Sequence, residues 1–518
     1  MVTMAATVNK LRPRSAKPAL RRQAPLAGAF SVLMLTLLAN PASAVEWKFS
    51  PSVGAKATYT DNVNQSHSDP QDALILSVTP GFSLQSQGSR RIQAAVNYGL
   101  TGVARFSDDN STDINHNLGA TGKAELIDDF LFIDGSASIS QELISLVGSP
   151  ADATTNSANR ATVGSYSISP YIQKRFGTFA RAMIRYTLSG ALFQDNAAND
   201  ITSNSLNASL TSGTQFNDLS WGLNYSLRDA TVQGGQDAKF ERYGANLGYK
   251  LTSHIRAFGT VGYDKNDYVS ASGAEISGRS WTAGLGWSPT RRTSVDASFG
   301  ETYSGRTYGF NLSHRTHNLA LTAGYNEGTS DISQLLTNTQ PITAWICDGD
   351  IFFGVGTLLP PPGQLNCVLL RTAPVGSVPL GIANGIFISK TLRGGAAWSK
   401  GRSSLGLNIF DTRRQYQQLV GLPEDETRGV SATYSYRLQP HTTLNASLGY
   451  TNTRVPAGLE SLSTARDDDF YTASLGVSHQ FDPKLSGALT LRHQQRESND
   501  STSSFDENSI TASASMRF

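Results

Sequence analysis

The chain has 518 residues, only two cysteines, and a formal net charge of +2 from 43 basic and 41 acidic side chains. Six of the basic residues and none of the acidic ones lie in residues 1–44, so the remainder carries a net charge of 37 − 41 = −4. A weakly acidic chain without a basic patch argues against nucleic acid as a partner. The mean hydropathy of −0.26, with no later apolar run of membrane-helix length, excludes a helical membrane protein.

Residues 1–44 have the features of a secretory signal peptide. A basic stretch from Lys10 to Arg22 precedes the apolar run AFSVLMLTLLA at 29–39, and Ala42-Ser43-Ala44 forms a small-residue cleavage site. The apolar run is too short to span a membrane. We therefore expect cleavage before Val45, with an uncleaved anchor as the alternative, and the mature chain would comprise residues 45–518.

Beyond the signal, apolar and polar residues alternate along segment after segment. The pattern is clear in LFIDGSASIS (131–140), ANLGYKL (245–251), GVSATYSYRL (429–438) and the C-terminal ITASASMRF (510–518). Successive side chains of a β-strand point to opposite faces, so a period of two predicts strands that lie between two environments. The apolar positions hold Ala, Leu and Tyr, and the others hold Ser, Thr, Asn and Gly.

The connections between these segments alternate between tight turns and longer polar loops. Gly177-Thr178 and Ser253-His254 are tight turns, whereas 107–113, 143–159 and 194–200 are longer and polar. This rhythm is typical of transmembrane barrels. The sequence predicts an all-β fold, a large antiparallel transmembrane β-barrel of about 22 strands, with 20 possible. A soluble sandwich or β-helix fits less well, because the repeated polar face requires a wet interior.

The C-terminal strand gives a cellular location. Apolar residues fall on every second position up to Met516 and Phe518, a pattern that resembles the C-terminal signal by which the assembly machinery recognises outer-membrane proteins. This resemblance implies a Gram-negative outer membrane, with the assembly machinery and membrane lipid as partners. An even strand number places both termini in the periplasm, and Phe518 in an aromatic girdle at that interface.

The first hairpin carries a further resemblance. Tyr59-Thr60-Asp61-Asn62-Val63, a polar loop, and Val78-Thr79-Pro80-Gly81-Phe82 resemble the opening of the outer-membrane proteins associated with PEP-CTERM/exosortase sorting, and of exopolysaccharide-operon outer-membrane proteins. The resemblance implies a barrel that fills the chain and a context of extracellular polysaccharide or its export components. Asp61 and Asn62 are interpreted as starting a turn through side-chain bonds to the backbone, rather than as a ligand site.

The strand pattern begins directly after the cleavage site, so we expect no N-terminal plug, and the predicted barrel needs something to narrow it. A closed sheet of this size would be roughly 40 Å across. The long extracellular loop at about 329–383 holds Cys347 and Cys367, which we expect to form a disulfide in an oxidising compartment, and is unusually apolar. It packs either into the barrel mouth or on a small core of its own.

Alternation predicts that Lys250, Arg437 and Arg492 point into the lumen. They favour anionic sugars or pair with wall carboxylates such as Asp134; both possibilities stay open. The eight histidines form no triad or zinc spacing, and His314 with His317 makes only a weak metal site. We therefore expect no enzyme, catalytic residue, metal or cofactor.

These features predict a passive channel or export component linked to extracellular polysaccharide or PEP-CTERM surface proteins. The alternatives are a plugged structural or binding barrel that presents its loops to matrix polymers, and a general diffusion porin. No nucleotide-binding part is visible that would couple transport to energy.

Overall fold

The structure is a computed structural model. It describes residues 45–108, 110–147, 159–194, 198–270, 276–331, 334, 342–347, 350–355, 367–370, 385–419, 421, 423–459 and 462–518. The predicted signal peptide and most of the long loop therefore lie outside the described residues.

Twenty-two strands of 10–17 residues form one antiparallel sheet. The first half consists of β1 (Glu46–Thr60), β2 (Ala73–Gln87), β3 (Ile92–Phe106), β4 (Ser111–Ile127), β5 (Leu131–Leu143), β6 (Arg160–Phe176), β7 (Ala180–Phe193), β8 (Ile201–Ser212), β9 (Leu219–Val232), β10 (Ala238–Lys250) and β11 (Ile255–Asp267). The second half consists of β12 (Gly278–Thr290), β13 (Thr293–Thr302), β14 (Gly305–Arg315), β15 (Leu319–Asp331), β19 (Ile386–Lys400), β20 (Ser403–Tyr416), β21 (Glu424–Gln439), β22 (Thr442–Val455), β23 (Arg466–Gln480), β24 (Leu485–Ser498) and β25 (Phe505–Arg517).

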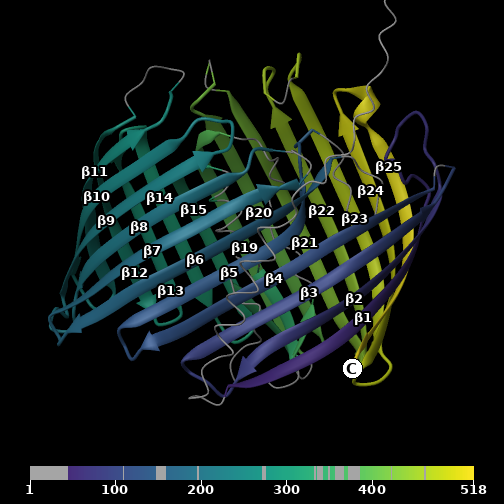
Figure 1. Cartoon of the computed structure of the whole chain (residues 1–518), viewed down its shortest axis with the longest axis horizontal. Coiled ribbons are helices and arrows are strands. Elements are labelled where there is room, and N and C mark those ends of the chain that lie inside the picture. The colour runs from purple at the N-terminus through teal and green to yellow at the C-terminus, as the bar shows by residue number, and fades with distance from the viewer. Residues whose placement is uncertain are drawn as a thin grey trace, which may run out of the picture.

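The sheet closes on itself, as Figure 1 shows. Each strand pairs with its neighbour in the chain, and β1 pairs with β25 in a register that runs from Ser52 opposite Arg517 to Thr60 opposite Ser509. Closure leaves no wall strand with an unpaired edge, which is the condition for a sheet to stand in a bilayer. The predicted fold class and the count of 22 strands are confirmed.

The connections differ between the two ends of the barrel. At one end, here called the turn end, strands are joined by six residues or fewer, as at 177–179 between β6 and β7 and at 401–402 between β19 and β20. Gly177 and Gly401 have positive φ there, which a side chain would disfavour. The other end, the loop end, carries most of the longer connections, including 61–72, 144–159 and 456–465. Both termini of the barrel lie at the turn end, where the N–H of Phe518 donates to the carbonyl of Pro51 at 3.0 Å.

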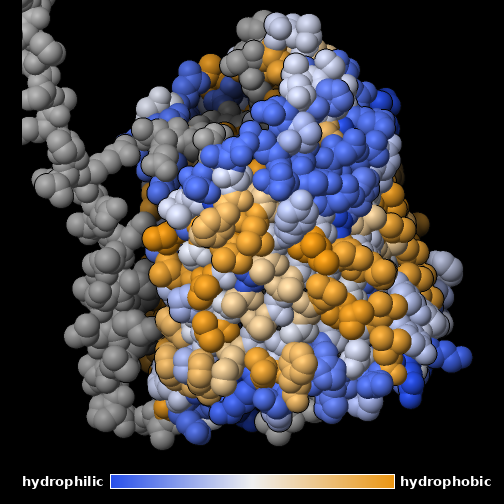
Figure 2. Space-filling view, turned by 90° about the vertical axis from the view of Figure 1, so that its right-hand side faces the viewer, coloured by the Kyte–Doolittle hydropathy of each residue, from blue (hydrophilic) through white to orange (hydrophobic). Residues whose placement is uncertain are grey.

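The outer face carries an apolar belt. Large apolar side chains at alternate positions are exposed there, for example Leu223, Leu247 and Val261, and Figure 2 shows hydrophobic surface between two hydrophilic margins. Aromatic residues border the belt. Towards the loop end, Tyr225, Tyr243 and Tyr263 lie opposite one another on neighbouring strands. Towards the turn end, exposed aromatics include Trp47, Phe49, Phe176, Tyr249, Trp287, Phe481 and Phe518.

This surface is that of a barrel that stands in lipid. An apolar band bordered by aromatic girdles matches the hydrocarbon core and the two interfaces of a bilayer. Phe518 and Met516 lie on the outward face, 60% and 39% exposed. Phe518 thus occupies the girdle at the turn end, as its place in the strand pattern predicts.

Between β15 and β19 the described segments form a separate three-stranded antiparallel sheet. It contains β16 (Ile342–Cys347), β17 (Asp350–Val355) and β18 (Cys367–Leu370). Cys347 lies directly opposite Cys367 in the pairing of β16 with β18. Opposed Cα atoms of antiparallel strands are about 4.5–5.5 Å apart, which suits a disulfide. The pairing is compatible with the predicted disulfide, which stays a prediction.

One wall strand, β15, extends past the predicted loop start at 329, whereas β19 begins after the predicted loop end at 383. Because β15 ends at Asp331 and β19 begins at Ile386, residues 329–331 belong to the wall. Within the described residues no helix is long and apolar enough to cross a bilayer.

Candidate functional site: the lumen and the segment that crosses it

Hydroxyl side chains cover the inner face of the wall. Pairs on neighbouring strands hydrogen bond to each other, as Thr79 does with Thr101 at 2.9 Å and Ser447 with Ser474 at 2.7 Å. Such cross-strand pairs stabilise a sheet modestly and leave further donors and acceptors for water. The predicted wet, polar lumen therefore has a neutral hydroxyl lining.

Most charged groups on this face are paired with each other. Arg185 contacts Asp134 at 2.8 Å, Arg256 contacts Asp296 at 2.9 Å, and Arg242 contacts Asp264 at 3.4 Å. The guanidinium of Arg185 also lies 4.0 Å from the ring centre of Tyr171. The sequence suggests Asp134 as a possible partner for lumen cations, and its partner is Arg185. Lys123 lies opposite Asp134 in the register. The amino group of Lys123 lies 5.8 Å from the ring centre of Phe132.

The three predicted lumen cations lie in two different settings. Arg492 contacts Glu507 on the neighbouring strand at 3.3 Å, which is the pairing that the sequence left open. Lys250 is the last residue of β10, between the outward, exposed Tyr249 and Leu251. Arg437 lies near the end of β21, before the exposed Leu438. Alternation puts these two on the inward face at the turn end, far from Arg492.

A short segment after β5 crosses the lumen. The side chain of Leu146 belongs to one buried apolar cluster with Phe387, Tyr416, Val455 and Leu459. The first of these lies on β19, which is eleven strands from β5 in either direction around the closed sheet. An extended chain spans at most about 3.6 Å per residue, so the three steps from Leu143 to Leu146 cover about 11 Å. Segment 144–147 therefore leaves the wall at β5 and reaches across the lumen to the cluster on β19, β20 and β22 and to Arg496 of β24.

Hydrogen bonds fix both ends of this crossing segment. At its base, the Asn159 side chain donates to the carbonyl of Ser145 and accepts from its N–H, each at 2.8 Å. At its tip, Arg496 of β24 donates to the carbonyl of Val147 at 2.8 Å. A buried guanidinium that bonds a backbone carbonyl gives a stronger contact than a neutral donor does.

A buried ion-pair network receives the tip. Arg496 also contacts Asp468, which accepts from Arg466 at 2.8 Å, and Arg466 contacts Asp500 at 2.9 Å. Beside it, Arg414 holds Asp425 in a bidentate pair at 2.6 and 2.9 Å, and the Tyr416 hydroxyl donates to the same carboxylate. Charges buried this deeply are stable only when partnered.

Asp500, in the connection after β24, is the one member of this network in a loop. The hydroxyl of Thr502 donates to its carboxylate at 2.7 Å and the N–H of Thr502 at 3.1 Å. These bonds, with the charge of Arg466, hold the pKa of Asp500 below its ordinary value.

The loop between β1 and β2 folds inward next to the network. Val63 packs against Ala73, Ile75 and Val103. The buried carboxylate of Glu507 accepts from Thr60 at 2.9 Å and from Gln65 at 2.8 Å. The motif Tyr59–Val63 therefore ties the first strand to the last, at the loop end.

The two polar residues of that motif are structural. The Asn62 side chain bonds the carbonyl and the N–H of Ser66 at 2.8 and 3.0 Å, which is the turn that the sequence predicts. Asp61 instead accepts from the N–H and side-chain amide of Asn508 on β25, at 2.7 and 2.8 Å. This contact across the closure was not predictable without knowing that the two strands pair.

On the other side of the crossing segment the inner wall bounds a cavity of about 800 Å³. Its lining is mainly hydroxyl and amide side chains, including Ser136, Ser167, Thr187, Ser205, Asn207 and Thr282. Arg228, Arg242 and Asp264 also line it.

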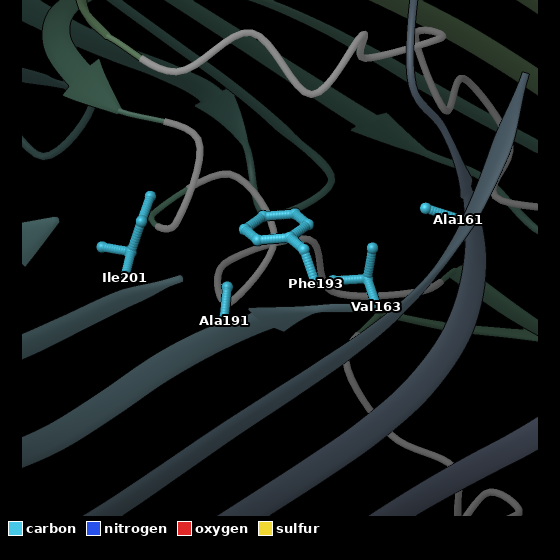
Figure 3. Close-up of a cluster of buried hydrophobic side chains, with 5 residues drawn as sticks. All are labelled: Ala161, Val163, Ala191, Phe193 and Ile201. Atoms are coloured by element: carbon cyan, nitrogen blue, oxygen red, sulfur yellow. The ribbon is translucent and has the colours of Figure 1, made fainter. Parts of the chain in front are cut away.

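A buried apolar cluster lies at the loop end, on the same side of the crossing segment as this cavity. Ala161, Val163, Ala191, Phe193 and Ile201 form a buried cluster at the ends of β6, β7 and β8. In Figure 3 all five side chains point into one space above the strands. Nearby, Tyr268 packs against Ala238 and Ile386, and burial raises the pKa of its hydroxyl.

The weak metal site is not assembled. His314 hydrogen bonds the Thr293 hydroxyl at 2.8 Å. In the described part of the chain no group of three or more His, Cys, Asp or Glu side chains is placed to hold a metal.

No protein-family model and no curated protein matches the sequence. Solved structures match at low identity. The FrpB iron transporter from Neisseria meningitidis (F5-1 variant) is 12% identical over 90% of this chain and 82% of its own, with a TM-score of 0.48. The siderophore receptor PirA from Acinetobacter baumannii is 9% identical over 92% of this chain and 81% of its own, with a TM-score of 0.47.

A third match is a loop L8 deletion mutant of OmpT, an outer membrane protein of Vibrio cholerae. It is 10% identical over 92% of this chain and 100% of its own, with a TM-score of 0.31. Likeness at these levels carries no argument about what this chain transports or binds. The closed sheet and its apolar belt define the class: this chain is a transmembrane β-barrel.

Proposed function

We propose that the protein is a passive channel in the outer membrane of a Gram-negative bacterium, with both termini in the periplasm and the loop end outside. The supporting observation is the combination of a hydroxyl-lined cavity of about 800 Å³ with a segment that crosses the lumen from β5 to β19. A polar lumen lets hydrophilic solutes pass, and the crossing segment limits their size. Outer-membrane lipid and the assembly machinery, which would read Met516 and Phe518, are the partners in this proposal.

The mechanism needs no chemistry from the protein. Solutes would exchange water for hydroxyl and amide groups along the wall, and the paired wall charges would hold no ion tightly. We propose neither a catalytic residue nor a cofactor.

Single-channel conductance in planar bilayers tests this proposal. The wild type is compared with Leu146→Asp, which places a carboxylate among Phe387, Tyr416 and Val455 and should free the crossing segment because a buried unpaired charge is costly. The matched control is Leu419→Asp, an exposed leucine in another loop at the same end. We expect steady openings from the wild type and the control, and larger openings from Leu146→Asp. Folded wild-type protein that gives no openings would refute the channel.

A plugged barrel that presents its loops to matrix polymers is the second candidate. It draws support from the buried ion-pair network and the inward-folded β1–β2 loop. This candidate predicts silence from the wild type and openings only from Leu146→Asp.

We further propose that the channel serves the export of extracellular polysaccharide or PEP-CTERM surface proteins, an idea that stems from the resemblance of the first hairpin. A deletion strain complemented with the wild type should recover surface polysaccharide or surface-anchored protein. Unchanged amounts of both in the deletion strain would remove this link while leaving the channel itself open to the conductance test.

A further inference from the structure

Basic side chains lie opposite one another on neighbouring strands at the turn end. Arg175 of β6 is paired with Arg181 of β7, and Lys250 of β10 is paired with Arg256 of β11. Opposed side chains of antiparallel strands have Cβ atoms about 4.5–5.5 Å apart, and like charges placed there destabilise the sheet. These pairs therefore do not serve the stability of the wall.

Two further basic pairs lie at the same end. The N–H of Arg315 donates to the carbonyl of Arg292 at 2.9 Å, and the N–H of Arg437 donates to the carbonyl of Arg402 at 2.8 Å. Each bond continues a strand ladder by one position, that of β13 with β14 and that of β20 with β21. Alternation along these ladders directs all four side chains to the lumen.

These cations lack the acidic partners that other charges of the inner face have. Arg256 contacts Asp296, but the other seven members of the four pairs have no ion-pair partner among the described residues. Arg292, Arg315 and Arg402 are exposed. Water screens part of their repulsion, and a bound anion would remove more of it.

One of the four pairs lines a groove. Arg292 and Arg315 border a space of about 550 Å³ at the connections between β12 and β13 and between β14 and β15. Arg291 and His317 also line it, together with six serine and threonine side chains. Of the described residues that form this lining, none is acidic and none is apolar.

The composition of the groove selects a class of ligand. A guanidinium group binds a carboxylate through two parallel hydrogen bonds, so two opposed arginines suit two neighbouring carboxylates. The serine and threonine hydroxyls can donate to or accept from the hydroxyls of a sugar. A protein partner would need apolar or aromatic anchors, which the groove does not offer, and a lipid headgroup lies outside the wall, whereas Arg292 and Arg315 face the lumen.

We propose that this groove binds a carbohydrate that carries two or more carboxylate groups, at the turn-end mouth of the barrel. The inference goes beyond the proposed channel and does not depend on it, because a plugged barrel presents the same groove.

Titration calorimetry on the full mature chain, refolded in detergent micelles, measures binding without requiring conductance. The ligands are trigalacturonate, neutral maltotriose of the same length, and triglutamate with blocked ends. The groove variants are Arg292→Gln and Arg315→Gln. The matched control is Arg90→Gln, which removes an exposed arginine from the connection between β2 and β3 at the same end.

We expect trigalacturonate to bind the wild type and Arg90→Gln equally well. Arg292→Gln and Arg315→Gln should each weaken binding at least about tenfold, because each removes charge-assisted hydrogen bonds. Triglutamate should bind the wild type several-fold more weakly than trigalacturonate, and maltotriose should not bind. Without ligand, Arg315→Gln should leave the urea midpoint unchanged or raised, since it separates two like charges.

Three outcomes would overturn the proposal. The first is no binding of trigalacturonate by folded wild-type protein, and the second is an equal loss of binding in Arg90→Gln, which would indicate attraction to the overall charge. The third is a lowered urea midpoint of ligand-free Arg315→Gln, which would make this arginine a structural contact. Triglutamate that binds as tightly as trigalacturonate would overturn the assignment to a carbohydrate.

Discussion

Two regions of the inner wall use inward-facing positions in opposite ways: the packed side, formed by β20–β25 and β1–β3 at the loop end, and the turn end of β11 and β13. On the packed side, Arg414 and Asp425 are 2% and 4% exposed and form a bidentate pair. At the turn end, Arg256 of β11 and Asp296 of β13 are 51% and 37% exposed and share one contact at 2.9 Å. Strand pairing and alternation are the same on both sides. The difference arises because the crossing segment and the β1–β2 loop cover the packed side and do not reach the turn end.

This comparison separates two roles for lumen charges in a barrel. Where loops cover them, ion pairs lose their water and become structural contacts whose loss is costly. Where they stay wet, the same pairs contribute little stability and are available to passing solutes. The exposure of a pair, more than its distance, decides which role it has.

The largest difference is expected from breaking one pair on each side. Arg414→Leu leaves Asp425 buried without its partner and should lower the free energy of unfolding by about 3–5 kcal/mol. Arg256→Leu should change it by no more than about 1 kcal/mol. Urea unfolding in detergent micelles, followed by tryptophan fluorescence, measures both. Equal losses would show that Asp425 is as solvated as Asp296.

A smaller effect is expected at the base of the crossing segment. Asn159→Ala removes two side-chain hydrogen bonds to Ser145 and should destabilise the segment locally by about 1–3 kcal/mol. We expect more frequent transitions between conductance levels, with the global unfolding midpoint almost unchanged. If Asn159→Ala changes conductance level as rarely as the wild type, the bonds from Asn159 do not hold the segment in place.

A second pair of variants compares a hydroxyl contact on the packed side with one between β6 and β7. Thr60→Ala removes a donor to the buried carboxylate of Glu507 and should cost about 1–3 kcal/mol. Thr187→Ala removes a neutral contact between β7 and Ser169 of β6 at 2.8 Å and should cost about 0.5–1.5 kcal/mol. The same urea titration gives the loss in free energy of unfolding for each variant. A larger loss for Thr187→Ala than for Thr60→Ala would argue against a water-excluded environment around Glu507.

The smallest effect concerns pH. Because the pKa of Asp500 is lowered in the folded protein, its charge contributes stability above the ordinary value of 3.8. That contribution is lost as pH falls through the folded pKa. Asp500→Asn should therefore lose stability relative to the wild type at neutral pH, and the gap should close in acid. A gap of the same size at about pH 7 and about pH 2 would mean that the charge of Asp500 does not stabilise the folded protein.

The fold was largely readable from the sequence, and the site was not. Alternation in segments such as 245–251 and 429–438, with short and long connections in turn, predicted the strands, the two faces and the closed sheet. The short segment 144–147 carries no such signal, because nothing in its four residues indicates a partner eleven strands away. The sequence signal for a constriction lies instead in the cysteine-containing loop, most of which lies outside the described residues.

The predicted lumen cations show the same limit of prediction from sequence. The period of two predicts that Arg492 points inward, but the sequence could not choose between a free cation and a paired one. Glu507 is adjacent only because β24 and β25 pair in one particular register.

What the sequence determined by itself is therefore local and periodic: which residues form strands, which face of each strand meets lipid, and where the chain turns. These follow from side-chain geometry and the apolar surroundings of the barrel. The tertiary structure alone decided which charges are buried, because burial at the loop end depends on Leu146, Val147 and Val63 reaching walls that are distant along the chain. Contacts of that kind depend on closure of the whole sheet, and no pattern within one segment encodes it.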